Sequence, residues 1–154
     1  MTSPLPQNPV ADLIAPPVRL QGWGWRHPGR EAWAVRDVTL EIAPQECVLI
    51  VGNSGAGKST LLHGIAGVLG VDEGESEGTL TIAGMPAFSP MVRGHVGLVQ
   101  QDPETQRVMG RLGDEVAFGL ENIGLPAEQI WPRVKDALAV VGLGYPLDHP
   151  TSHL

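Results

Sequence analysis

An α/β fold is predicted for this chain, because strand-like and helix-like segments follow one another around a glycine-rich turn. Residues Val38–Ile42 alternate apolar and polar side chains with a period of two, as a half-buried strand does. Cys47–Val51 is an unbroken apolar run, which is typical of a strand buried on both faces of a parallel sheet. In Lys58–Val68 the apolar residues recur at helical spacing. The predicted order is therefore strand, strand, glycine-rich turn and helix.

The length and composition fit one globular domain and give no sign of nucleic-acid binding. The chain has 154 residues, of which 42% are apolar and 18% are charged, enough for one hydrophobic core. Its formal net charge is −7, with acids and bases spread along most of the chain. Because nucleic-acid binders usually carry a basic surplus or stripe, no nucleic-acid partner is expected.

Cysteine usage and hydropathy favour a cytoplasmic protein. The single cysteine, Cys47, cannot form an internal disulfide, and its place in the apolar run predicts a buried, unreactive thiol. No stretch approaches the ~20 apolar residues that span a bilayer, and the N-terminus lacks the features of a signal peptide. If a membrane is involved, a partner must supply the membrane-spanning part.

The remaining segments are predicted to be a leader, loops and further elements. Residues 1–17 hold five prolines and few large apolar groups, which predicts a flexible leader. The acidic segment Gly70–Gly78 is interpreted as a solvated loop in preference to a metal site. The other predicted elements are strands at Thr79–Ile82 and His95–Val99, helices at Asp114–Asn122 and Ala127–Val141 (with Pro132 in the first turn or at a kink), and a loop-like tail, Pro146–Leu154.

The glycine-rich turn satisfies the phosphate-loop pattern G-x-x-x-x-G-K-[ST]. Its glycines permit backbone angles that aim successive N–H groups into one cavity, and the helix that follows adds the positive end of its dipole. Lys58 reaches the β- and γ-phosphates as a compact cation, while the Ser59 hydroxyl is a hard oxygen ligand suited to Mg²⁺. The residues predicted to bind ATP here are Gly52, Asn53, Ser54, Gly55, Ala56, Gly57, Lys58, Ser59 and Thr60, with Lys58 also catalytic.

Two stretches of the chain resemble the ATPases of ATP-binding cassette (ABC) transporters. Val38–Ile42, the following turn and the phosphate loop with Leu61 and Leu62 resemble the opening of such a domain, except that Gln45 stands where the family usually has glycine. Gly78–Gly84 resembles the strand and turn after the family's first helix. The resemblance implies a P-loop NTPase core with an antiparallel β subdomain and the start of a helical subdomain. Residues 18–154 would then be the N-terminal portion of a nucleotide-binding domain.

A third stretch, Val96–Gln106, is similar to the Q-loop of ATPases that drive cobalt and vitamin importers of the energy-coupling-factor type. By this resemblance Gln101 is the Q-loop glutamine, a catalytic residue whose amide oxygen ligates Mg²⁺ or orients water. Asp114–Gly119 also resembles that subgroup, although its apolar positions suit a core helix equally well. The resemblance implies a transmembrane transporter subunit and a second ABC ATPase domain as partners, at the inner face of the cell membrane.

Residues that contact adenine are expected just before the first recognised strand, where the family carries an aromatic side chain. Aligning Trp25–Gly29 with the family pattern places His27 at the usual tyrosine, with Trp25 two residues earlier, and the choice between them stays open. Val35 is expected to line the same pocket, whereas Trp23 and Trp33 are interpreted as packing residues.

Two parts of the family's catalytic machinery are absent from the sequence. The family has an apolar strand ending in Asp-Glu, but neither Asp72-Glu73 nor Asp114-Glu115 follows four large apolar residues. The signature loop Leu-Ser-Gly-Gly-Gln is also absent, although Pro150–Leu154 resembles the lead-in to it. We therefore expect a truncated domain that binds nucleotide weakly, does not hydrolyse ATP at a useful rate, and aggregates through an exposed sheet edge beside Cys47–Val51.

Two other function classes stay open at this point. A soluble ABC protein acting on ribosomes or in DNA repair would use the same phosphate loop without a membrane partner. A small kinase or GTPase would share the loop alone, but the guanine-reading Asn/Thr-Lys-x-Asp motif of GTPases is not found. The transported substrate, a metal ion or a vitamin in the leading interpretation, is selected by the membrane partner.

Overall fold

The computed structural model describes residues 15–70, 74–92, 96–102 and 107–154, which belong to two compact units. The first unit comprises the described residues 15–70, 74–92 and 96–99, and the second those at 100–102 and 107–154. Most of the proposed leader, 1–17, lies outside the described residues, as does the acidic pair Asp72-Glu73. None of the helices in these ranges is both long enough and apolar enough to cross a membrane.

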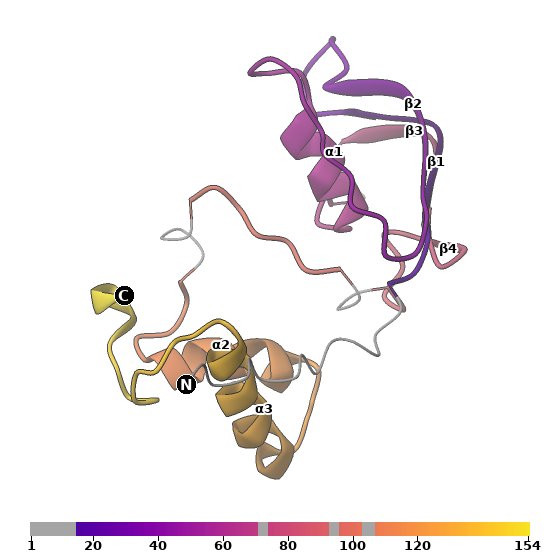
Figure 1. Cartoon of the computed structure of the whole chain (residues 1–154). Coiled ribbons are helices and arrows are strands. Elements are labelled where there is room, and N and C mark those ends of the chain that lie inside the picture. Colours follow the sequence, from indigo (N-terminus) through magenta and orange to yellow (C-terminus); the bar gives the residue numbers. More distant parts are fainter. Residues whose placement is uncertain (1–14, 71–73, 93–95, 103–106) are drawn as a thin grey trace, which may run out of the picture. The chain divides into compact units, whose positions relative to one another are not determined.

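The first unit is built on a four-stranded antiparallel sheet with the strand order β2-β1-β3-β4 (Figure 1). Its strands are β1 (Val18–Arg26), β2 (Val35–Ile42), β3 (Glu75–Ile82) and β4 (Met85–Pro86). The strand predicted at Val38–Ile42 is confirmed as the larger part of β2. β3 begins four residues before the predicted Thr79, inside the segment interpreted as an acidic loop. β1 was not predicted, yet it lies between β2 and β3 and pairs with both.

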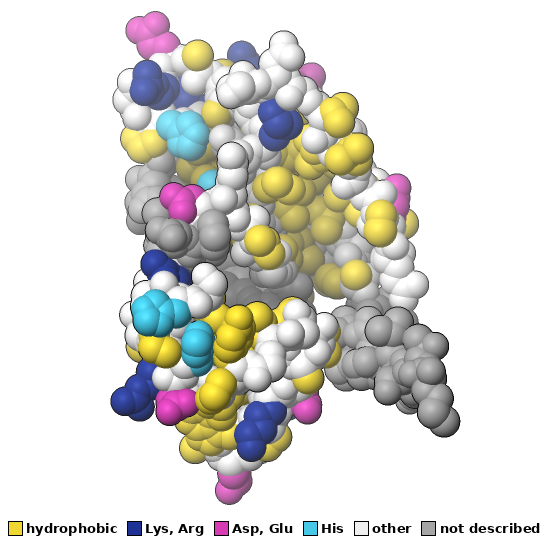
Figure 2. Space-filling view, turned by 60° about the vertical axis from the view of Figure 1, so that its left-hand side comes forward, with side chains coloured by type: hydrophobic (Ala, Val, Ile, Leu, Met, Phe, Trp, Pro, Cys, Tyr) yellow, Lys and Arg dark blue, Asp and Glu magenta, His cyan; other side chains and the backbone are white. Residues whose placement is uncertain are grey.

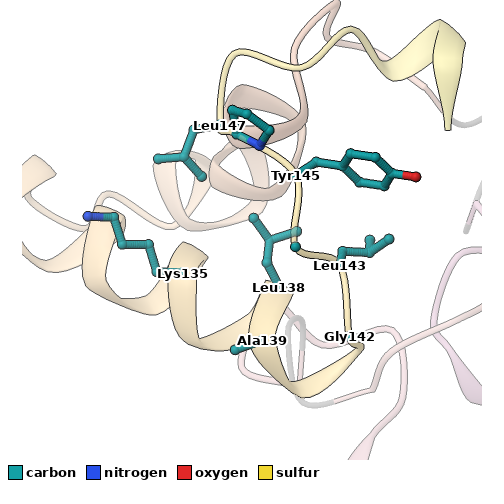
Figure 3. A pocket seen from close by; sticks show the side chains of 9 residues that line it. Lys135, Leu138, Ala139, Gly142, Leu143, Tyr145 and Leu147 are labelled. Carbon is teal, nitrogen blue, oxygen red and sulfur yellow. The ribbon is translucent and has the colours of Figure 1, made fainter.

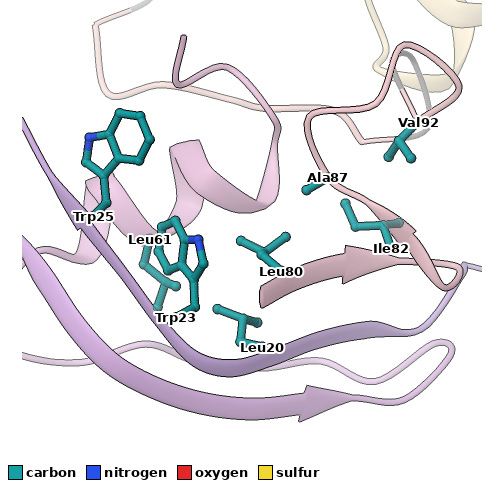
Figure 4. Close-up of a cluster of buried hydrophobic side chains, with 8 residues drawn as sticks. All are labelled: Leu20, Trp23, Trp25, Leu61, Leu80, Ile82, Ala87 and Val92. Atoms are coloured by element: carbon teal, nitrogen blue, oxygen red, sulfur yellow. The ribbon is translucent and has the colours of Figure 1, made fainter. Parts of the chain in front are cut away.

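The hydrophobic core of the first unit lies between this sheet and the helix α1 (Lys58–Ile65). Trp23, from β1, is 1% exposed and packs against α1, since a Cβ added at Gly64 would lie 2.4 Å from its ring. Burial of each large apolar side chain contributes about 1.5–3 kcal/mol to folding. Figure 4 shows the cluster, which consists of Leu20, Trp23, Trp25, Leu61, Leu80, Ile82, Ala87 and Val92.

The second unit is a helical pair, α2 (Leu112–Asn122) and α3 (Ala127–Val140), followed by a short 3-10 helix, η2 (Thr151–His153). The predicted apolar stripe of α3 is confirmed at Ile130, Val134 and Leu138, which are all buried. Its last member, Val141, follows the helix and is exposed. Pro132 lies inside α3, which begins at Ala127, so the helix does not start near Trp131.

The parallel strand predicted at Cys47–Val51 and the strand predicted at His95–Val99 are not strands among the residues that the structure describes. Cys47–Val51 pairs with no strand among the described residues, and Leu49 is 84% exposed. The described part of His95–Val99 is also without strand structure, and Val99 is 95% exposed. The predicted burial of Cys47 is therefore wrong, since its side chain is exposed. The physical reason is that a parallel strand is buried only when neighbouring strands supply its hydrogen bonds and cover its faces.

The surface of the first unit consequently carries large apolar side chains, several of which are in view in Figure 2. Those that are exposed near the apolar run and along α1 are Val48, Leu49, Val51, Leu62 and Val68. Unpaired apolar backbone of this kind favours association between copies of a chain.

We predict that Leu49→Lys reduces self-association without loss of stability. The side chain is 84% exposed, so its replacement should change the free energy of unfolding by only about 0.5 kcal/mol or less. Light scattering against concentration measures association, and urea denaturation measures stability. The matched control is Leu80→Ala, in a side chain that is 5% exposed, which should cost about 2–5 kcal/mol. A large loss of stability in Leu49→Lys would contradict the exposed, unpaired run.

A candidate phosphate-binding site

The phosphate-loop residues form a tight turn that leads directly into α1. Within it the backbone N–H of Ala56 donates to the carbonyl of Asn53 at 3.2 Å. Gly55 and Gly57 have φ angles of 78° and 84°, in the left-handed region that glycine adopts without strain. The first N–H groups of a helix have no intrahelical acceptor, so those of Lys58, Ser59 and Thr60 are available to an anion, whereas that of Leu61 donates to the Gly57 carbonyl.

Gly57 is held against the start of β2. A Cβ at this position would lie 2.2 Å from the carbonyl oxygen of Ala34 and 2.7 Å from a methyl carbon of Val35. No side chain fits in that space, and the left-handed φ independently favours glycine. Glycine is therefore required at position 57 for two reasons, the left-handed backbone conformation and the close approach of the sheet.

The Lys58 ammonium is folded back over the loop. Its Nζ donates to the carbonyl oxygens of Gly52 at 2.9 Å and Asn53 at 2.7 Å. The side chain is half-buried, whereas Ser59 beside it is exposed. An ammonium has three donors, so one remains for a phosphate oxygen while these two bonds persist. The lysine thus closes the loop and places a positive charge at its rim.

Of the two candidate adenine contacts, only His27 is placed beside the phosphate loop. Its Nε2 lies 3.5 Å from the Oγ1 of Thr60 in the first turn of α1. Trp25 is 2% exposed and belongs to the core (Figure 4), so a base could not reach its ring without unpacking that core. Val35 is half-buried and adjoins Gly57, which places it on the same side as His27.

The structure does not relate Gln101 to the phosphate loop, because the two belong to different units. The Gln101 side chain is exposed, and it lies at the start of the second unit, whereas the phosphate loop belongs to the first. Residues 103–106 of the Q-loop-like segment lie outside the described residues. The assignment of Gln101 as a Mg²⁺ ligand and catalytic residue stays a prediction.

The rejected acidic pair at 114–115 has a structural use. Glu115 is in the first turn of α2, and its carboxylate accepts the backbone N–H groups of Val108 and Met109. A carboxylate engaged in this way stabilises a helix N-terminus and the loop before it. In the part of the chain that the structure describes, no three His, Cys, Asp or Glu side chains are grouped so that they could hold a metal ion.

The second unit has an open pocket of about 480 Å³ beside the end of α3 (Figure 3). Its wall is mostly aliphatic, with Lys135 contributing the only full charge among the lining residues. It has no residue of the phosphate-loop motif in its lining, and the candidate nucleotide site stays the loop before α1.

Sequence reasoning missed one residue of the site, Ala34. Its contribution is a backbone carbonyl that fixes the approach of Gly57, and no side-chain pattern signals such a contact. The only available signal is the second glycine of the motif itself, which requires close backbone contact somewhere in the fold.

Comparison with known proteins adds a family and several relatives. A family model described as ABC transporter matches residues 35–153. The energy-coupling factor transporter ATP-binding protein EcfA1 of Lacticaseibacillus paracasei is 37% identical over 129 residues, covering 82% of this chain and 45% of that protein. A putative ABC transporter ATP-binding protein of Halobacterium salinarum is 42% identical over 113 residues, covering 72% of this chain and 47% of that protein.

A solved structure is also similar. This is cbiO1 from Clostridium perfringens, described as part of the ABC transporter complex cbiONQ, with a TM-score of 0.72 and 27% identity. The match covers 91% of this chain and 56% of that one. The chain thus spans about half the length of the relatives it matches. The predicted fold class, that of a P-loop ABC ATPase with an antiparallel β subdomain, is confirmed.

We predict that Gly57→Ala destabilises the first unit more than Gly55→Ala does. Both substitutions place alanine at a left-handed φ, which costs about 1 kcal/mol. At Gly57 the new Cβ would also meet the Ala34 carbonyl, whereas nothing lies within 4 Å of a Cβ at Gly55. Chemical denaturation of both variants isolates the effect of the close approach. Equal losses of stability would contradict the contact between the loop and β2.

Proposed function

Because this chain belongs to the ABC transporter family, we propose that it is the ATP-cradling part of an importer's motor subunit. In the full-length protein, ATP binding and hydrolysis would drive uptake of a metal ion or vitamin through a transmembrane partner. The observation that carries the proposal is the phosphate loop itself, with Gly57 held against Ala34 and Lys58 closing the turn.

The loop's own groups suit a triphosphate. Backbone N–H groups of Gly52–Thr60 would bind the phosphate oxygens, and the Lys58 ammonium would add a charge-assisted bond to the β- and γ-phosphates. Ser59, which is exposed at the first turn of α1, and Gln101 are the proposed oxygen ligands of Mg²⁺. That ion, when bound, would neutralise phosphate charge during transfer.

The base is proposed to lie against His27 and Val35. His27 is next to Thr60, and Val35 is next to Gly57, so both border the loop from the β1–β2 side. An imidazole face stacks on a purine, although it covers less of it than a phenol or indole would. Trp25 is buried in the core, so its ring is not proposed as a contact of the base.

An importer is favoured over a soluble ABC protein by the relatives. EcfA1 is named as an energy-coupling factor transporter protein, and cbiO1 is described as part of a transporter complex. By analogy, we propose that the full-length protein works with a transmembrane subunit and a second ABC ATPase domain at the cytoplasmic face of the membrane. The substrate class, a metal ion or a vitamin, rests on the same analogy.

We further propose that the 154-residue chain alone binds ATP but does not turn it over. Its sequence holds no apolar strand ending in Asp-Glu. The carboxylate of Glu115 accepts the backbone N–H groups of Val108 and Met109, so it is engaged at the start of α2. A Mg²⁺-dependent turnover that Lys58→Ala abolishes would overturn this part of the proposal.

Lys58→Ala is predicted to weaken ATP binding by the 154-residue chain about 10- to 100-fold, because it removes a charge-assisted bond to phosphate. Isothermal titration calorimetry with Mg²⁺ and ATP measures the change. The matched control is Lys135→Ala, which removes a lysine from α3 in the other unit and should leave the affinity unchanged. Equal effects of the two substitutions would mean that binding is not at the phosphate loop.

Tagged full-length protein, purified in detergent from its native cells, is predicted to carry a transmembrane subunit with it. Mass spectrometry of the purified complex identifies the companions. Recovery with ribosomal or DNA-repair proteins instead would favour the soluble ABC alternative. Recovery with no companion, together with a loss of ATP binding, would favour a generic phosphate-loop protein.

A further inference from the structure

The sheet face opposite the core carries a side-chain cluster that nucleotide binding does not use. Along β1, Trp23 and Trp25 point into the core, so the alternate residues Gly24 and Arg26 lie on the other face. The ring of Trp33 is beside Arg26 and Arg36, with 5.2 Å from its centroid to the Cζ of Arg26 and 5.2 Å to that of Arg36. Both distances are short enough for cation–π contacts with the indole.

Both guanidinium groups are held in place by acids of β3. Arg26 pairs with Glu75, and the Nε of Arg36 lies 3.0 Å from the Oε1 of Glu77. These two acids balance the two positive charges, so the cluster is not an anion site. The two ion pairs hold the guanidinium groups next to the Trp33 ring.

The second ion pair crosses the middle strand. Glu77 is on β3 and Arg36 is on β2, with β1 between them. The Glu77 side chain passes over Gly24, where an added Cβ would lie 3.0 Å from its Cγ and its Oε1. A Cβ at this point of β1 would be tight against Glu77 and the Val35 carbonyl, so glycine eases the crossing.

The cluster is attached to the same hairpin that borders the phosphate loop. The connection from β1 to β2 is closed by the Ala34 N–H, which donates to the Trp25 carbonyl at 2.9 Å. It begins with His27, which is beside Thr60, and ends at Ala34, which abuts Gly57. The hairpin is thus fixed to the phosphate loop by its two ends, and Trp33 contacts Arg26 of β1 and Arg36 of β2.

We propose that Trp33 is a positioning residue for recognition of the nucleotide base. Through its contacts with Arg26 and Arg36, its ring fixes the β1–β2 hairpin and so keeps His27 at the side of the phosphate loop where a base would lie. Trp33 itself touches neither base nor phosphate. The inference rests on the proposed function, because it assigns this role only if the loop beside Thr60 binds a nucleotide.

The test compares a ligand that has a base with one that has none. Wild-type chain and Trp33→Ala are titrated calorimetrically with ATP and with inorganic tripolyphosphate, at one fixed Mg²⁺ concentration. ATP affinity is expected to fall about five- to tenfold in Trp33→Ala, since base stacking depends on the placed ring, while tripolyphosphate affinity stays unchanged. Trp131→Ala, which removes an indole from the second unit, is the matched control and should change neither.

A cycle with His27→Ala separates positioning from general stability. If Trp33 acts through His27, the double variant binds ATP no more weakly than His27→Ala alone. Trp33→Phe keeps an aromatic ring beside the guanidinium groups and is expected to retain most of the ATP affinity that Trp33→Ala loses. The proposal would be overturned if the loss in the double variant were the product of the two single losses. It would also be overturned if Trp33→Ala weakened ATP and tripolyphosphate binding equally.

A second variant covers the case in which Trp33→Ala does not fold. Arg36→Gln removes one of the two guanidinium contacts of Trp33. It should lower ATP affinity by a smaller factor than Trp33→Ala does. Unchanged ATP affinity in Arg36→Gln and Trp33→Ala, with wild-type binding still dependent on Lys58, would overturn the inference alone. If the wild-type chain binds neither ligand, the proposed function fails and the inference fails with it.

Discussion

The contact between Trp23 and Gly64 determines where α1 lies on the antiparallel sheet, and the phosphate loop depends on that placement. The indole is 1% exposed, and any side chain at Gly64 would overlap it. An aromatic side chain that buries ~200 Å² of apolar surface contributes about 5 kcal/mol at ~25 cal/mol per Å². Because α1 begins at Lys58, fixing the helix also fixes Gly57 against Ala34 and Thr60 beside His27.

The features predicted well from sequence are those whose physical requirements are local. The glycine-rich turn that leads into α1 at Lys58 is one, because its glycines, lysine and helix start fall within nine residues of each other. The stripe of α3 is another, since Ile130, Val134 and Leu138 recur at helical spacing and all are buried. In both cases a short window of sequence contains the whole reason for the structure.

The features that sequence reasoning missed depend on partners far along the chain. Glu75 and Glu77 occur among glycines and were interpreted as loop, yet they lie in β3 because their backbone pairs with Arg26 and Gly24 of β1. β1 itself mixes glycine and tryptophan, and its strand structure follows from pairing on both sides. The opposite error occurred at Cys47–Val51, whose apolar run indicates a buried strand but meets no neighbouring strand among the described residues.

Because the run before it is unpaired, the phosphate loop is supported by neighbouring structure in its second half but not in its first. Its second half, Gly57 to Thr60, is supported by the sheet, whereas Gly52 follows directly on the exposed run and is itself exposed. The two bonds from Lys58 to the carbonyls of Gly52 and Asn53 hold that first half in place. Ordering backbone costs about 1–2 kcal/mol per residue, so a ligand that orders the first half gives up part of its binding energy. Any structure that pairs with Cys47–Val51 would order the first half of the loop before the nucleotide binds. Covering this run would therefore raise nucleotide affinity without any contact with the nucleotide.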